Sequence, residues 1–220
     1  MKKVLMASAL MLCTSAVFAE PTAVLKVNGK LTASTCSVIM GNGGVIDYGY
    51  IHLNELNATE NNDLGNKSIP MTIDCTAKTK VGFTMQDNRS SSQAGVPVSI
   101  NSNANVTAPY YLYGVGTTAN GVNIGNYGLW MTDVEVDGAA ADPIAQNDGW
   151  SATTWKKAGA PRSDALQTNT FAETGTTTPM AFKTATFNFV SNLGIKDTTT
   201  LNITDDTALD GQATMTLVYL

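Results

Sequence analysis

The chain has 220 residues and a formal net charge of −5, with 43% hydrophobic and only 14% charged residues. This acidic balance argues against nucleic acid as a partner, because binding to a phosphate backbone depends on clustered Lys and Arg. The length suits one domain with a sizeable core, and sparse charge with abundant Thr, Asn, Ser and Gly is typical of an exported β-protein.

The first nineteen residues predict an export signal. Lys2 and Lys3 precede an apolar run from Val4 to Leu12, and small residues surround a cleavage point after Ala19. We therefore expect a single mature domain over residues 20–220, without a membrane span, since a spanning helix needs ~20 apolar residues. Without Lys2 and Lys3 the 13 basic residues fall to 11, against 18 acidic ones, so that the mature net charge is −7.

The first predicted strand lies soon after the cleavage point, where Ala23, Leu25, Val27 and Leu31 alternate with Lys and Asn. A shift of phase near residue 33 predicts a bulge or bend that turns Cys36 inward. A shorter apolar run follows over residues 45–51. Residues 54–67 are polar and predict a loop.

The clearest strand pattern surrounds the second cysteine of the mature chain. From Ile69 to Met85 the odd positions are mostly apolar and the even ones mostly polar, so Cys75 faces inward with the apolar set. Cys36 and Cys75 would meet in an oxidising compartment, and we predict that they form a disulfide. Closing this loop should stabilise the fold by ~4 kcal/mol. Two unpaired thiols remain an alternative, whereas a single histidine and the lack of Cys-x-x-Cys disfavour zinc.

Further strands are predicted along the rest of the chain, over residues 97–100, 110–115, 127–136, 181–190 and 200–204. Between them, residues 138–178 are too long for an ordinary connection, so this region either contains short strands or forms a functional surface excursion. The final strand is well marked, because one of its faces carries Gly211, Ala213, Met215, Leu217 and Tyr219. Many short strands with polar turns predict an all-β sandwich.

No residue pattern predicts catalysis or a cofactor. His52 is the single histidine, and no Gly-x-Ser-x-Gly turn presents a serine to it. Asp205 and Asp206 predict a turn before the last strand, since the spacing of a calcium-binding EF-hand loop is absent. We therefore expect no enzyme, no bound metal and no cofactor.

Tryptophans in the central region offer a different kind of site. Trp150 and Trp155 lie in the long segment of residues 138–178, where exposed rings could stack on a sugar. Rings of this kind also pack in protein cores, so both interpretations of these two residues stay open.

Taken in order along the chain, these features resemble the pilins that are assembled by the chaperone–usher route. They are the export signal, Val27-Asn28-Gly29-Lys30-Leu31 before Cys36, the Ile73-Asp74-Cys75 strand, and an alternating final strand with Tyr219 as the penultimate residue. The resemblance implies an immunoglobulin-like β-sandwich that lacks its last strand and leaves a groove over the core. It also implies export through the periplasm to the cell surface, as a subunit of a fimbrium.

The resemblance further implies how the groove is filled. A periplasmic chaperone supplies a strand first, an outer-membrane usher follows, and the N-terminal segment of another fimbrial subunit then replaces the chaperone by strand addition. Gly211, Ala213, Met215, Leu217 and Tyr219 would border the groove. Ala23, Leu25 and Val27 are the candidate donor segment; because that segment is short, the pattern favours a minor or tip subunit over a major shaft subunit.

Two other functions stay open at this point. A carbohydrate-binding fimbrial adhesin would use Trp150 and Trp155 to contact a host glycan. A self-contained secreted β-sandwich that binds an unrelated partner would supply all of its own strands and need no chaperone.

Overall fold

The computed structural model describes residues 26–147 and 154–220, in two compact units, Met1–Ala33 and Ser34–Leu220. The predicted signal, residues Ala23 and Leu25, and Trp150 lie outside the described residues. In the first unit, residues 26–33 form no regular secondary structure, and their side chains are exposed. The strand predicted around Val27 is therefore absent from the described part of that unit.

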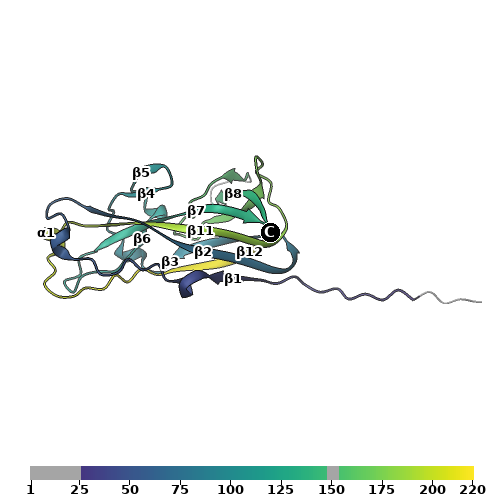
Figure 1. Cartoon of the computed structure of the whole chain (residues 1–220), viewed down its shortest axis with the longest axis horizontal. Helices are drawn as coiled ribbons and strands as arrows, with labels where there is room; N and C mark the ends of the chain where they lie inside the picture. Colours follow the sequence, from purple (N-terminus) through teal and green to yellow (C-terminus); the bar gives the residue numbers. More distant parts are fainter. Residues whose placement is uncertain (1–25, 148–153) are drawn as a thin grey trace, which may run out of the picture. The chain divides into compact units, whose positions relative to one another are not determined.

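The second unit is all-β (Figure 1). Its strands are β1 (Cys36–Met40), β2 (Asn62–Thr79), β3 (Val81–Asp87), β4 (Val98–Ile100), β5 (Asn103–Val106), β6 (Tyr113–Gly114), β7 (Gly125–Val136), β8 (Ala139–Asn147), β9 (Lys156–Lys157), β10 (Gln167–Glu173), β11 (Phe182–Ile195) and β12 (Ala213–Tyr219). A one-turn helix, α1 (Thr198–Leu201), and four 3₁₀ turns, η1 (Gly41–Gly44), η2 (Leu53–Glu55), η3 (Ser90–Ser92) and η4 (Pro109–Tyr111), complete the described elements.

One antiparallel sheet contains most of these strands. Its main path runs β1-β2-β11-β7-β8-β10-β3-β12, with β6 attached to β7 and β9 attached to β8, while β4 and β5 form a separate pair. The first and last strands of this path approach each other at one point, where the Cys36 amide donates to the Tyr219 hydroxyl at 3.0 Å. The sheet is therefore nearly closed on itself.

Alternation in the sequence explains the longest strands. Ile69, Met71, Ile73 and Cys75 are buried on one face of β2, and the residues between them are exposed or half-buried. The predicted disulfide is confirmed, because Cys36 lies directly opposite Cys75 in the β1–β2 register and is bonded to it. At the β7–β8 turn, Asp137 and Gly138 both have positive φ, which is the conformation that a tight two-residue hairpin requires.

Aromatic rings fill the main core. The ring of Phe83 lies 5.9 Å from that of Phe187 and 6.0 Å from that of Phe189, while Phe171 meets both Phe182 and Phe187. These rings come from β3 and from two consecutive strands much later in the chain, β10 and β11. Burial of apolar surface contributes about 25 cal/mol per Å², so this cluster stabilises the unit.

Two further sequence predictions on secondary structure are wrong. Residues 54–67 were expected to form a loop, but β2 already begins at Asn62, because β11 is long enough to pair with it there: Asn62 lies opposite Ile195. Residues 200–204 were expected to form a strand, but Asp197 caps a helical turn by accepting a hydrogen bond from the Thr200 amide at 2.8 Å.

The long region of residues 138–178 contains two inner strands of the sheet, β8 and β10, and the short strand β9. β8 and β10 pair over seven residues, from Gln167 opposite Asn147 to Glu173 opposite Ala141.

In the described part of the chain, no helix has the length and apolar character needed to cross a membrane.

Candidate functional site: an open groove between the end strands

The two end strands of the sheet are each paired on one side. β12 pairs with β3, and β1 pairs with β2. In an antiparallel ladder, alternate residues turn both backbone groups toward the partner, and the residues between them turn both groups away. Which groups face away from the sheet therefore follows from the register.

In β12 the outward groups belong to the odd-numbered residues. The Asn88 amide donates to the Gln212 carbonyl at 2.9 Å and the Leu220 amide donates to the Lys80 carbonyl at 3.0 Å, so even-numbered residues face β3. The backbone groups that face away belong to Ala213, Met215, Leu217 and Tyr219. Of these four residues, the first three also pack their side chains against the main core.

The same argument applies to β1. The Thr76 amide donates to the Thr35 carbonyl at 2.9 Å, so the backbone groups of Cys36, Val38 and Met40 face away from β2. One of these outward amides, that of Cys36, is the donor to the Tyr219 hydroxyl. The side chain of Tyr219 thus spans from one end strand to the other and occupies a bonding position that a neighbouring strand would otherwise take.

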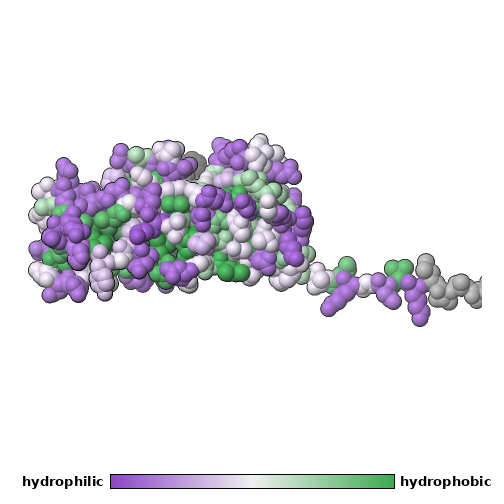
Figure 2. All heavy atoms as spheres, in the orientation of Figure 1, coloured by the Kyte–Doolittle hydropathy of each residue, from purple (hydrophilic) through white to green (hydrophobic). Residues whose placement is uncertain are grey.

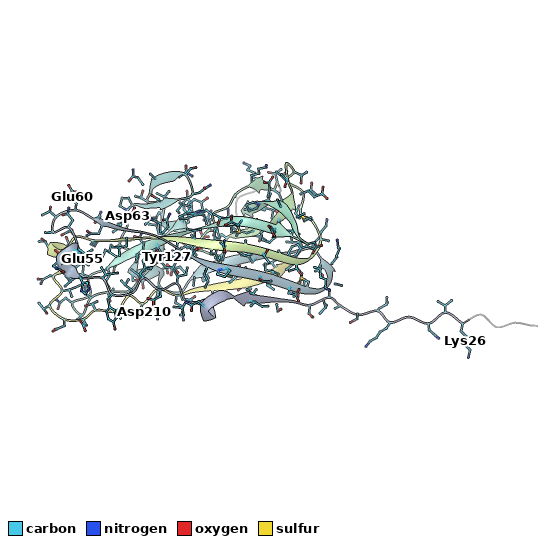
Figure 3. All side chains as sticks on the ribbon, in the orientation of Figure 1. Lys26, Glu55, Glu60, Asp63, Tyr127 and Asp210 are labelled. Carbon is cyan, nitrogen blue, oxygen red and sulfur yellow. A yellow bond between two sulfur atoms is a disulfide. The ribbon has the colours of Figure 1, made fainter. Side chains whose placement is uncertain are left out.

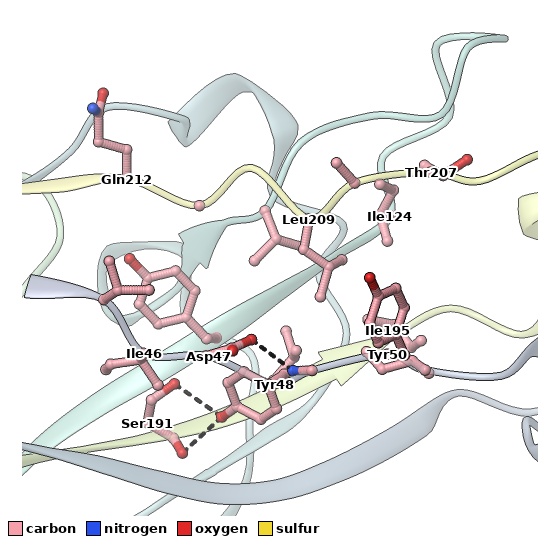
Figure 4. Close-up of a pocket in the computed structure, with 18 of the residues that line it drawn as sticks. Ile46, Asp47, Tyr48, Tyr50, Ile124, Ser191, Ile195, Thr207, Leu209 and Gln212 are labelled. Atoms are coloured by element: carbon pink, nitrogen blue, oxygen red, sulfur yellow. Dashed lines mark hydrogen bonds between the residues drawn. The ribbon is translucent and has the colours of Figure 1, made fainter. Parts of the chain in front are cut away.

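An open groove continues from this point, with a cavity volume of about 970 Å³. Its two margins are the chain that follows β1, residues 40–51, and the chain that leads into β12, residues 203–213 (Figure 4). Its floor is apolar and includes Ile69, Met71, Met85, Val115, Ile124, Leu129, Phe189, Leu193, Ile195 and Leu201. The groove therefore exposes part of the core between two chain segments that belong to no strand over most of their length.

Two tyrosines give the groove its few polar atoms on the floor. The Tyr48 hydroxyl bonds to the carbonyl and the hydroxyl of Ser191, at 2.9 and 3.1 Å (Figure 4). Burial raises the pKa of the Tyr48 phenol, and it also raises the pKa of the Tyr127 phenol strongly. Both phenols are therefore neutral at physiological pH, and the floor carries no charge from them.

Charge lies instead along the margins. Asp47 on one margin and Asp205 and Asp206 on the other are exposed, and the lining of the groove contains no Lys, Arg or His. Two further acidic residues, Glu55 and Glu60, lie toward the α1 end of this unit (Figure 3).

The chain that enters β12 is anchored by the turn after β3. Arg89 forms an ion pair with Asp210 at 2.8 Å, and its Nε donates to the Asp210 carbonyl at 3.2 Å. The Asn88 side chain donates to Thr214 Oγ1 at 2.9 Å. Asp87, which is buried, holds this turn by accepting from the Arg89 amide at 2.8 Å. The margin is thus fixed where it joins β12.

Apolar side chains reach the surface along this site. Most of the large hydrophobic residues that are exposed in the described part of the second unit lie on the end strands and the margins or next to them: Ile39, Met40, Val45, Tyr50, Leu53, Leu209, Tyr219 and Leu220. Figure 2 shows apolar atoms at the surface of this unit between polar ones. A surface of this kind, beside unpaired strand edges, is a typical site for the addition of another strand.

The residues predicted from sequence are distributed as follows. Ala213, Met215, Leu217 and Tyr219 lie on β12, and Gly211 lies on the margin just before it. Val27 is 90% exposed in the first unit. Trp155 is half-buried beside β9, and His52 is exposed at the start of η2.

Sequence reasoning missed both margins of the groove. Residues 45–51 were recognised only as an apolar run, and residues 203–209 were divided between a strand and a turn. The signal was present, since Ile46, Tyr48 and Tyr50 alternate with Asp47 and Gly49. Such an alternation is typical of a strand, yet here the segment has no strand beside it on the groove side, so no ladder forms.

Comparisons with known proteins find one family and two relatives. Residues 25–128 match the family described as "Protein of unknown function (DUF1120)", a stretch just under half of the chain that contains β1 and the margin of residues 40–51. The chain is 28% identical to Protein GltF of Escherichia coli K12, over 89% of this chain and 87% of that protein. It is 27% identical to Uncharacterized protein YhcF of the same organism, over 99% and 98%.

The contact between the end strands leads to a prediction. Tyr219→Phe keeps the ring but removes the hydroxyl that accepts from the Cys36 amide, so we expect a loss of about 1 kcal/mol in the free energy of unfolding by urea. Tyr50→Phe is the matched control and should leave stability unchanged, because the Tyr50 side chain is 98% exposed. Equal stability of the Tyr219 variant and the wild type would contradict a role for this bond.

Proposed function

We propose that this chain is a structural subunit of a bacterial surface fimbria that is assembled by strand addition. The observation that carries the proposal is the groove with an apolar floor between residues 40–51 and 203–213, which continues from an edge of β12 where the backbone groups of Ala213, Met215 and Leu217 face away from the sheet. In this function the groove is filled first by a periplasmic chaperone, with an outer-membrane usher acting next, and then by another subunit. The finer fold that fits this role is an immunoglobulin-like sandwich that lacks one strand.

Strand addition explains why the molecule would need a partner. Unpaired edges beside exposed apolar surface favour aggregation, and an added strand satisfies the backbone groups while its alternate side chains cover the floor. The proposal gives the chain no chemistry of its own, and it places the mature protein at the cell surface after export.

The experiment measures entry into fibres. A tagged chain, expressed with a chaperone and an usher, should be recovered from fibres sheared off the cell surface. Met215→Pro removes an amide that faces away from the sheet, so this variant should fold but fail to enter fibres. Thr216→Pro is the matched control, because it removes an amide that faces β3 and should destabilise the fold itself.

Deuterium exchange tests the same idea without a substitution. In the isolated chain, the amides of Ala213, Met215 and Leu217 should exchange much faster than those of Thr214, Thr216 and Val218. In fibres both sets should be protected. Slow exchange of both sets in a stable isolated monomer would overturn the proposal and favour a self-contained secreted protein.

A further inference from the structure

We infer that a small polar pocket between the start of β2 and the β4–β5 hairpin binds one neutral sugar residue. The pocket has a cavity volume of about 220 Å³, and its polar lining residues are Asn61, Asn62, Asp63, Ser99 and Asn105. It shares no lining residue with the groove beside β12, so a strand in that groove would not occupy it. Trp155, which the sequence offered as a sugar contact, does not line it either. The inference therefore goes beyond the proposed function and does not depend on it.

One buried side chain connects the two walls of this pocket. Asn192 of β11, which is 2% exposed, accepts a hydrogen bond from the Ser99 amide at 2.8 Å and donates one to Asp63 Oδ1 at 2.8 Å. Ser99 belongs to β4 and Asp63, labelled in Figure 3, belongs to β2. A single buried amide thus sets how these two residues lie relative to each other, because both of its ends are bonded.

The wall formed by β4 is also fixed against the sheet. Asn126 of β7 is fully buried, and its side chain accepts from the Val96 amide at 2.9 Å and donates to the Val96 carbonyl at 2.8 Å. Two glycines let the hairpin approach the sheet closely. A Cβ at Gly194 would lie 2.8 Å from Val96 Cγ1, and a Cβ at Gly128 would lie 2.5 Å from Ile100 Cγ1. The pocket is therefore formed before a ligand arrives, as is typical of small-molecule sites.

Four polar groups in the pocket are available to a ligand. The Asp63 carboxylate uses Oδ1 for both of its hydrogen bonds, and no described residue bonds to its Oδ2. The side-chain amides of Asn61 and Asn105 and the hydroxyl of Ser99 form no hydrogen bond within the described part of the chain. Amides and hydroxyls both donate and accept, whereas a carboxylate only accepts. This mixture matches adjacent hydroxyl groups of a sugar, which also donate and accept.

The rest of the lining argues against other ligand classes. It contains no Lys, Arg or His, so an anionic ligand would meet only the negative charge of Asp63. No group of three acidic, His or Cys side chains that could hold a metal ion is found among the described residues. The cavity is smaller than the roughly 300–1,000 Å³ of a pocket for a drug-sized ligand, which suits a single ring. Val96, Pro97 and Val98 provide an apolar side for the C–H groups of that ring.

The experiment titrates the isotope-labelled mature chain with methyl glycosides and follows its backbone amide signals by NMR. The glycosides are those of mannose, galactose and glucose, which between them present both cis and trans pairs of adjacent hydroxyls. At least one of them should shift the signals of Asp63, Ser99 and Asn105 until the site is saturated. The signals of Ile46 and Leu209, which line the groove, should not move.

Two substitutions test the polar groups. Asp63→Asn keeps the shape of the side chain but removes its charge, and it should weaken binding about tenfold, because hydrogen bonds to charged groups are the stronger ones. Ser99→Ala should weaken binding about threefold, as the loss of one neutral hydrogen bond does. Asn103→Ala is the matched control, since Asn103 is exposed on β5 of the same hairpin and does not line the pocket. Unchanged amide signals away from the pocket verify that each variant is folded.

The outcomes decide between a sugar site and its rivals. Saturable binding that weakens in Asp63→Asn and Ser99→Ala but not in Asn103→Ala supports the inference. The absence of a saturable shift with all three glycosides overturns it, and so does equal binding by all variants. A separate titration uses butylammonium chloride; shifts at the pocket with this cation and with no glycoside would indicate a site for ammonium groups and overturn the sugar site. If the chain enters fibres but binds no glycoside, this inference fails while the proposed function stands.

Discussion

A chain that carries its own donor strand should melt at a temperature about 6–12 °C higher than the wild type. The variant appends residues 21–33 after Leu220 through a short flexible linker, so that the added strand returns antiparallel to β12. Burial of Leu25, Val27 and Leu31 and the new backbone hydrogen bonds should together exceed the cost of ordering the strand by about 3 kcal/mol, which corresponds to this shift. Differential scanning calorimetry of the purified proteins measures the shift.

A matched extension separates burial from length. The same extension with Val27→Asp and Leu31→Asp has equal length and an equal linker, yet it cannot cover the apolar floor. We expect its melting temperature to equal that of the wild type. The prediction would be contradicted by an equal rise in both extended chains, or by no rise in either.

Loss of the disulfide should lower the free energy of unfolding by about 4 kcal/mol, because the bond closes a loop between residues 39 positions apart. β1 depends on it more than an inner strand would, since β2 is its single ladder partner. The double variant Cys36→Ser, Cys75→Ser should therefore unfold at much lower urea concentration. The same change should appear in the wild type after reduction.

The effect should also be local. Amides of β1 that face β2, those of Ser37 and Ile39, should exchange faster in the double variant, whereas amides between β7 and β11 should change less. Wild-type protein treated with an alkylating reagent without prior reduction is the control and should behave as untreated protein. A shift in unfolding free energy below about 0.5 kcal/mol would rule out a major role for the bond.

How far the sequence predicts this molecule depends on whether a segment's partners are encoded nearby. Alternation alone located β2, β7, β11 and β12, because each has a continuous apolar face on the core. The disulfide followed from two inward-facing cysteines in an exported chain. The start of β2 at Asn62 could not be predicted, since its polar residues form a strand only because β11 extends opposite them.

The groove illustrates the same limit more strongly. Its border on β12 was predicted from alternation and from resemblance to pilins. Its acidic margins were not, because Asp47 and Asp205 are about 160 positions apart and meet only when the sheet nearly closes. The alternation along a sequence predicts which face of each segment is apolar. It does not predict which two segments lie at the edges of the sheet without a paired strand.

The hydrogen bond from the Cys36 amide to the Tyr219 hydroxyl limits where an added strand can lie. A strand added along the open edge of β1 would contact the Tyr219 side chain at one end. This contact would fix where the added strand ends, and therefore which of its side chains contact the floor of the groove. Because Tyr219 closes the groove at one end only, the added strand could enter it in one direction. Molecules joined in this way would all point in the same direction, which gives the filament two chemically different ends.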